Sequence, residues 1–244
     1  LFPSVNEKIH CLPTHFWNVS DRPAASIQAM LRQTFDPSHK RSLTVLSVSG
    51  LCGGPGESPL FRDLTFHLPP GFSVLLGDEG VGKTSLMRLL SGDLTPQAGQ
   101  MRLLGDTVPW VPPQPSGVFW TDLRLPLHDQ DTPGQCWAHL RASLPRWCTE
   151  TQNSLIGTWQ LDPHLGKSLN MLSTGTRRKI GLVAALASGA TVTLLDQPFA
   201  ALDASAIRSL QASLAQLGQN KDRAWLIADY VKPSHLPLAS VLEL

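Results

Sequence analysis

The chain has 244 residues, of which 42% are apolar and 16% are charged, as in a globular protein with a sizeable core. Its net charge of +1 provides no broad basic field, so the composition argues against a nucleic-acid-binding function. The four cysteines show no C-x-x-C pair or metal-ligand spacing, so we expect reduced thiols in a cytosolic protein. The longest uncharged run, 180–195, is shorter than a membrane span.

Residues 1–40 differ from the rest of the chain, because prolines interrupt every candidate element there. We interpret this stretch as a poorly ordered N-terminal extension or an upstream translated segment. The alternative is a short helix over Ala24–Phe35, in which apolar side chains recur at helical spacing.

Three strands are predicted in the next part of the chain. The first covers Leu43–Val48, and a glycine- and proline-rich loop follows over residues 50–59. The second covers Phe61–Leu68, in which apolar and polar residues alternate, and the third is the apolar run Phe72–Leu76. The first two strands predict a small antiparallel layer beside the motif that comes next.

That motif is Gly77–Thr84, which reads G-x-x-x-x-G-K-T. It lies between the strand Phe72–Leu76 and a predicted helix over Ser85–Leu90, which is the strand–loop–helix context of a phosphate-binding loop. Its glycines allow backbone N–H groups to surround a phosphate at a helix N-terminus. Lys83 can reach the β- and γ-phosphates of a nucleotide, and the Thr84 hydroxyl can ligate Mg²⁺. The alternative, a glycine-rich turn that carries Lys-Thr by chance, does not explain the flanking elements. The predicted nucleotide-binding residues are Gly77, Gly80, Gly82, Lys83, Thr84 and Ser85.

A helical subdomain is predicted over about residues 115–172, after a short strand at Met101–Leu104. The segment is rich in helix formers, but prolines divide it into short pieces. It contains four tryptophans, Trp120, Trp137, Trp147 and Trp159. Clustered tryptophans either mark a partner-binding face or pack an ordinary helical core, and the sequence leaves both interpretations open.

The C-terminal part alternates between predicted helices and strands. Leu172–Thr176 precedes an apolar helix that continues through Ala187, and Thr191–Asp196 is a buried strand that ends in an acid. A carboxylate at the end of such a strand holds Mg²⁺ in phosphate-binding-loop enzymes. The remaining predicted elements are a helix over Ile207–Leu217 and strands at Trp225–Ala228 and Val241–Leu242.

In this order, the segments resemble the ATP-binding cassette of ABC transporters over nearly all of the chain outside the N-terminal extension. Leu172–Thr176 is similar to the family signature L-S-G-G-Q, and Gln114 matches the glutamine of the Q-loop. Asp196–Phe199 and Ala201–Asp203 resemble the D-E-P-F and A-L-D segments at the end of the Walker B strand. The resemblance implies a cassette over residues 41–244 with an α/β fold: a P-loop core with a mainly parallel sheet, a small antiparallel layer and an inserted helical subdomain.

The resemblance also implies ligands and partners. ATP and Mg²⁺ would lie between two cassettes in a homodimer or heterodimer. Ser173 and the Gly175 backbone would contact the γ-phosphate held by the partner's P-loop, at a helix start that favours anions. Thr84, Asp196 and Gln114 would hold Mg²⁺. The basic run 177–179 follows inside the signature helix, where the alternative reading is a solvated helix face.

Several positions depart from the family pattern. Gln197 replaces the usual catalytic Glu, and Asp229 replaces the switch His. A glutamine can orient a water but cannot accept its proton, and loss of a general base costs about 10²–10⁴-fold in rate. Thr174 and Thr176 replace a Gly and the Gln of the signature. The candidate catalytic residues are Gln197, Asp229 and Gln114.

Two functions follow from this reading. The first is an ATP-binding subunit that powers transport through a separate integral membrane subunit, docked near Gln114 and Trp120, at the inner face of the cell membrane. Hydrolysis would be weakened by Gln197 and Asp229. Within the family, the chain looks most like the small exporter ATPases of cytochrome c maturation, which are linked to haem export. The alternative is a degenerate regulatory cassette that pairs with an active ATPase. Neither function involves nucleic acid.

Overall fold

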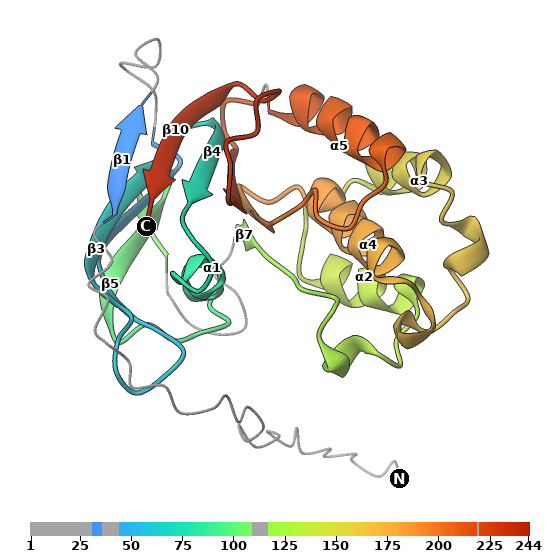
Figure 1. The fold of residues 1–244 in the computed structure, drawn as a ribbon, viewed down its shortest axis with the longest axis horizontal. Coiled ribbons are helices and arrows are strands. Elements are labelled where there is room, and N and C mark those ends of the chain that lie inside the picture. The colour runs from blue at the N-terminus through green and yellow to red at the C-terminus, as the bar shows by residue number, and fades with distance from the viewer. Residues whose placement is uncertain (1–30, 36–43, 109–116, 219) are drawn as a thin grey trace, which may run out of the picture.

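A computed structural model describes residues 31–35, 44–108, 117–218 and 220–244, which form two sheets flanked by helices (Figure 1). The larger sheet has six strands in the order β1-β10-β4-β9-β8-β7. The smaller sheet has four strands in the order β3-β2-β5-β6. The strands of the larger sheet are β1 Arg32–Phe35, β4 Gly71–Leu76, β7 Val118–Phe119, β8 Val192–Asp196, β9 Ala224–Asp229 and β10 Leu238–Glu243. Those of the smaller sheet are β2 Leu46–Gly53, β3 Phe61–Leu68, β5 Ala98–Leu103 and β6 Asp106–Thr107.

The larger sheet is parallel from β10 to β7 and antiparallel only where β1 pairs with β10. Its central strands β4, β8 and β9 are almost continuously apolar, because both of their faces are buried. Parallel strands present their carboxyl ends at one edge. Leu76 pairs with Asp229, and Asp196 pairs with Ala228. The loops that follow these three strands therefore meet, and this edge carries the candidate site.

The smaller sheet is antiparallel throughout, as the alternating pattern of Phe61–Leu68 predicted. The predicted loop over 50–59 is partly wrong, because β2 continues to Gly53. Two register shifts in β2 accommodate the glycines, and Gly50 has a φ of 63° that favours glycine. Leu51 between them is fully buried and pairs with Leu64, which keeps the strand in the sheet.

The helices cover the sheets and form a separate group on one side of the molecule. Figure 1 shows α2 and α3 beside α4 and α5, away from the smaller sheet, whereas α1 lies between β4 and the smaller sheet. The α-helices are α1 Lys83–Leu90, α2 Pro133–Ala142, α3 Thr149–Thr158, α4 Thr174–Ala187 and α5 Ala204–Leu217. Short 3₁₀ turns lie at η2 Pro126–His128, η3 Asp162–His164 and η4 Leu169–Met171. Among the described residues, no helix combines the length and the apolar character needed to cross a bilayer.

The tryptophans of the predicted helical subdomain pack inward. Trp120, Trp137 and Trp159 are 6%, 3% and 6% exposed. Two of their indole N–H groups donate within the fold, from Trp137 to the Ile180 carbonyl and from Trp159 to the Ser209 hydroxyl. The structure thus supports the packing interpretation over a partner-binding face for these three residues.

The first described strand differs from the expectation for its segment. The helix suggested over Ala24–Phe35 is wrong at its end, because Arg32–Phe35 is β1; residues 24–30 lie outside the described residues. The strand pairs with β10, the Gln33 amide donates to the His67 carbonyl, and the Phe35 ring stacks on His67 with centroids 4.6 Å apart. Pairing with β10, a strand more than 200 residues away, outweighs the local helical spacing.

Candidate functional site

The phosphate-binding loop joins β4 to α1 in the predicted strand–loop–helix arrangement. Gly80 and Gly82 have φ values of 78° and 109°, which side chains rarely adopt. A Cβ on Gly82 would also lie 2.6 Å from Leu60 Cδ2, so a side chain there would have to displace Leu60 as well. Helix α1 begins at Lys83, and Ser85 lies in its first turn. The free N–H groups of this turn and the loop backbone can receive a phosphate.

Lys83 is held at the centre of this loop. Its side chain is 6% exposed, and Nζ donates to the Gly77 carbonyl at 2.6 Å and the Asp78 carbonyl at 2.8 Å. The Nζ atom also lies 4.3 Å from the centre of the Tyr230 ring, a cation–π contact. Burial lowers the pKa of Lys83, while the carboxylates of Asp196 and Asp78 act in the opposite direction. The charge of Lys83 thus lies where β8 and β9 end.

Thr84 and Asp196, two of the three predicted magnesium ligands, lie side by side. The Thr84 hydroxyl donates to Asp196 Oδ2 at 2.6 Å, although 112 residues separate the two. Asp196 Oδ1 is buried and has no hydrogen-bond partner in the described structure. A buried, unpaired carboxylate oxygen beside a hydroxyl fits a hard cation with oxygen ligands, such as Mg²⁺. Gln114, the third predicted ligand, lies outside the described residues.

Gln197 directly follows β8, and Asp229 is the last residue of β9. The Gln197 N–H donates to the Ala228 carbonyl at 2.9 Å, and Gln197 has a φ of 46°, an uncommon value for a residue with a side chain. Asp229 Oδ1 accepts the N–H of Tyr230 at 2.7 Å. Two of the three predicted catalytic residues therefore lie at the edge of the sheet that carries the phosphate-binding loop, and the third, Gln114, lies outside the described residues.

Tyr230 is a site residue that the sequence reading missed. Its hydroxyl lies 3.4 Å from Gln197 Nε2, while its ring covers Lys83. It is 48% exposed and is the only tyrosine in the chain. The available signal was its place directly after Asp229, the position equivalent to the family's switch His.

The signature residues form a second group at the start of α4. Ser173 is the N-cap, and its Oγ accepts the Thr176 N–H at 3.1 Å. A Cβ on Gly175 would lie 2.7 Å from the Ala201 carbonyl, so the glycine permits a close approach to the segment after Phe199. No hydrogen bond or ion pair joins Ser173 to the phosphate-binding loop in the described part of the chain.

The basic run that follows the signature is engaged rather than solvated. Arg177 pairs with Asp129 at 2.8 Å, and Lys179 pairs with Asp203 at 2.8 Å. Arg178 donates to the carbonyls of Asp196 and Gln197. Helix α4 is thus attached directly to the end of β8, where the predicted magnesium ligand Asp196 and the predicted catalytic residue Gln197 lie.

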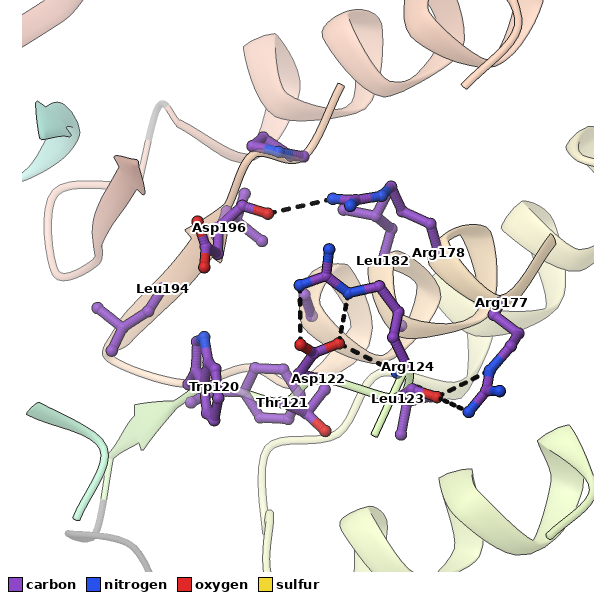
Figure 2. A pocket seen from close by; sticks show the side chains of 15 residues that line it. Trp120, Thr121, Asp122, Leu123, Arg124, Arg177, Arg178, Leu182, Leu194 and Asp196 are labelled. Atoms are coloured by element: carbon purple, nitrogen blue, oxygen red, sulfur yellow. Dashed lines mark hydrogen bonds and ion pairs between the residues drawn. The ribbon is translucent and has the colours of Figure 1, made fainter. Parts of the chain in front are cut away.

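A pocket of about 50 Å³ lies between α4, β8 and the segment after β7 (Figure 2). Trp120 lines one wall, and Arg124 forms a bidentate pair with Asp122 at 2.6 and 2.8 Å. Arg178 lines another wall. Burial lowers the pKa of Arg178, and the positive charge of Arg124 lowers it further. The pocket is too small for a nucleotide, and Trp120, expected near a docking groove, is buried in its wall.

The comparisons with known proteins agree with this geometry. Residues 61–200 match the family model described as ABC transporter. The taurine import ATP-binding protein TauB of Pseudomonas putida is 32% identical over 194 residues, covering 78% of this chain and 73% of that protein. The cytochrome c biogenesis ATP-binding export protein CcmA of Nitrosococcus oceani is 31% identical over 178 residues, covering 70% of this chain and 79% of that protein. A solved ATP-binding subunit of an ABC transporter superposes with a TM-score of 0.60 at 19% identity, over 77% of this chain and 80% of its own. The predicted α/β cassette fold is confirmed.

Proposed function

Because the chain belongs to the ABC transporter family, we propose that it is a Mg-ATP-binding subunit of a transporter and hydrolyses ATP slowly on its own. One contrast supports this proposal. The pair Thr84–Asp196 retains the chemistry of a magnesium site, with a buried and unpaired carboxylate oxygen. At the same edge of the sheet, Gln197 and Asp229 stand at the two positions where the family resemblance expects a base and a histidine.

The proposed nucleotide-binding part of the site consists of the phosphate-binding loop, Lys83, Thr84 and Asp196. The N–H groups of the loop and of the first turn of α1 would receive the phosphates, and Lys83 would supply the positive charge. Lys83 must then exchange its bonds to the Gly77 and Asp78 carbonyls for phosphate oxygens. Thr84 and Asp196 would hold Mg²⁺, which neutralises charge on the phosphates when bound.

The proposed hydrolytic part of the site lacks a proton acceptor at position 197, where the family resemblance expects a Glu. The Gln197 amide can hold a water by hydrogen bonding but cannot take its proton. The Asp229 carboxylate accepts the Tyr230 N–H, and its negative charge opposes a nearby γ-phosphate. We therefore expect turnover about 10²–10⁴-fold below that of a cassette with a general base.

The family also guides the proposed assembly. TauB is named as an import protein and CcmA as an export protein, so the direction of transport does not carry over to this chain. We propose a dimer of cassettes, homo- or heteromeric, in which Ser173 and Gly175 face the partner's nucleotide. A separate integral membrane subunit would complete the transporter, with this chain at the cytoplasmic face of the membrane.

The test measures binding and turnover separately. Calorimetric titration with Mg²⁺ and a non-hydrolysable ATP analogue should show binding, and Lys83→Ala should weaken it about 10–100-fold, the value of a charged hydrogen bond. Steady-state hydrolysis should be slow, and Gln197→Glu should raise it at least tenfold while Gln197→Ala does not. Absence of binding would refute the nucleotide site. Wild-type turnover near the ~10 s⁻¹ typical of enzymes would refute slow hydrolysis but leave the proposed nucleotide site intact.

The second candidate is a regulatory cassette that binds ATP and pairs with an active ATPase. The same two replacements, Gln197 and Asp229, favour it, because a partner could supply the second, competent site. Purification of the tagged chain from its native membranes separates the two functions. A multi-span membrane protein in the complex supports the transporter subunit, and a soluble ATPase as the sole partner supports the regulatory cassette.

A further inference from the structure

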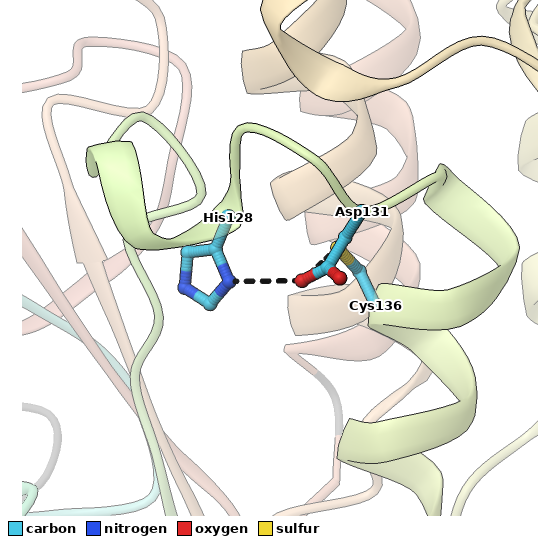
Figure 3. Close-up of side chains that lie close together, drawn as sticks. All are labelled: His128, Asp131 and Cys136. Carbon is cyan, nitrogen blue, oxygen red and sulfur yellow. Dashed lines mark hydrogen bonds and ion pairs between the residues drawn. The ribbon is translucent and has the colours of Figure 1, made fainter.

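Three side chains of metal-binding type converge near the start of α2 (Figure 3). His128 is the last residue of η2, Asp131 lies in the turn that follows, and Cys136 lies in α2. One ligand atom from each residue lies within 4.8 Å of the other two. The cysteine spacing alone gave no hint of this cluster, because only one of its members is a cysteine.

The separations suit a metal better than a hydrogen-bonded triad. His128 Nδ1 lies 3.7 Å from Asp131 Oδ2, which is longer than a normal hydrogen bond. Cys136 Sγ lies 4.0 Å from the same oxygen. Tetrahedral zinc bonded at its usual lengths places nitrogen and oxygen ligands about 3.4 Å apart, and sulfur and oxygen about 3.6 Å apart. The two separations to the Asp131 oxygen exceed these values by about 0.3–0.4 Å. The histidine and cysteine ligand atoms lie within 4.8 Å of each other, so that side of the triangle would have to close by up to about 1.2 Å.

The local backbone already fixes the cluster. The Asp131 N–H donates to the His128 carbonyl at 3.1 Å, and the Asp131 carbonyl accepts the Leu169 N–H at 2.9 Å. Cys136 is 3% exposed. The side chains of His128 and Asp131 are 24% and 32% exposed, which leaves a solvent side for a water as fourth ligand. The backbone around these three side chains would therefore need little ordering when a metal ion binds.

The charge near the cluster permits a cation. Arg177 is the nearby cationic side chain, but its guanidinium is paired with Asp129 at 2.8 Å and also donates to the Leu123 carbonyl. Asp131 contributes a carboxylate, and a coordinated Cys136 thiolate would add a second negative charge. A site with one nitrogen, one oxygen and one sulfur ligand favours Zn²⁺ over Mg²⁺ or Ca²⁺, which prefer oxygen alone.

We propose that His128, Asp131 and Cys136 form a zinc site that joins η2 to α2. Bound zinc would hold the turn before α2 against the helix and stabilise the folded chain in proportion to RT ln(1 + [Zn²⁺]/Kd). The site is independent of the nucleotide-binding function, so each can fail without the other.

Cobalt provides the test, because tetrahedral Co²⁺ bound to a thiolate absorbs in the near ultraviolet and the visible. Titration of the full chain with Co²⁺ alone should produce a thiolate-to-cobalt band that added Zn²⁺ removes. Cys136→Ser should abolish the band. Cys148→Ser is the matched control and should keep it, because Cys148 lies beside Thr151 and Glu150, in a different part of the fold.

Two further variants guard against loss of folding. His128→Ala changes a partly exposed turn, and Asp131→Asn preserves the shape of its side chain. Each should weaken Co²⁺ binding at least tenfold while circular dichroism stays that of the wild type. Zinc should raise the melting temperature of the wild type but not of Cys136→Ser. Absence of the band in the wild type, its persistence in Cys136→Ser or its loss in Cys148→Ser would overturn the proposal.

Discussion

At the scale of single residues, Tyr230 changes how the nucleotide site is understood. The sequence reading treated Gln197 and Asp229 as separate replacements. The structure shows that Tyr230 contacts both of them and Lys83: its hydroxyl approaches Gln197, its backbone N–H donates to Asp229, and its ring covers Lys83. If Lys83 binds phosphate as we propose, the phosphates and the aromatic ring would compete for the same ammonium group.

This competition predicts an unusual effect of mutation. Tyr230→Ala should tighten binding of the Mg²⁺–ATP analogue about 2–5-fold, because an exposed cation–π contact is worth about 0.5–1 kcal/mol. Tyr230→Phe keeps the ring over Lys83 and should leave the affinity unchanged, which makes it the matched control. Calorimetric titration of the three proteins measures the difference. Weaker binding by Tyr230→Ala would show that the ring assists the nucleotide instead of competing with it.

At the scale of secondary-structure elements, two helix N-termini support the site. Ser173 caps α4, and Asp203 caps α5 through a 2.8 Å bond from the Ala206 N–H to its Oδ1. Asp203 also accepts a bond from Lys179 in α4, so one carboxylate joins both helices. Together with Arg178, these contacts attach the signature helix to the end of β8 and to the segment that follows it.

The Asp203 contacts predict a pH dependence of stability. The bond from Lys179, followed by the Ala206 N–H, lowers the pKa of Asp203 from 3.8 to about 2. A carboxyl group whose pKa is lower in the folded than in the unfolded state stabilises the fold at pH values above its unfolded pKa. This contribution is lost as the pH falls from about 4 towards 2. Asp203→Asn keeps a capping side chain without the charge. In urea titrations, the wild type should therefore be more stable than Asp203→Asn at pH 6, with a smaller difference at pH 3. An equal difference at both values would contradict the assigned role of the charge.

At the scale of the whole molecule, the N-terminal strand closes one edge of the larger sheet. Strand β1 covers β10, which in turn pairs with β4, the strand that leads into the phosphate-binding loop. Removal of residues 1–36 should expose the edge of β10 and lower the melting temperature by a few degrees, since about 1 kcal/mol corresponds to 2–4 °C at this size. Removal of residues 1–30 retains β1 and is the control. Equal melting temperatures for the two truncated chains would show that β1 adds no stability.

Local patterns predicted the parts of the fold whose signals are local. The alternation of Phe61–Leu68 gave β3, and the apolar run before Asp196 gave β8. The meeting of Thr84 with Asp196 followed from the family resemblance. Strand β1 could not be predicted, because Leu31 and Phe35 have helical spacing and only pairing with β10 decides their conformation. The contact of Tyr230 with Lys83 likewise depends on the folded arrangement of two parallel strands.

The path of the chain after β10 has a practical consequence. The Leu244 N–H donates to the Leu76 carbonyl at 3.0 Å, and a Cβ on Gly77 would lie 3.3 Å from the Leu244 carbonyl oxygen. Any polypeptide joined after Leu244, including an affinity tag or a fused reporter, leaves the fold beside the first glycine of the phosphate-binding loop. Nucleotide affinities are therefore best measured on protein from which any polypeptide fused after Leu244 has been cleaved.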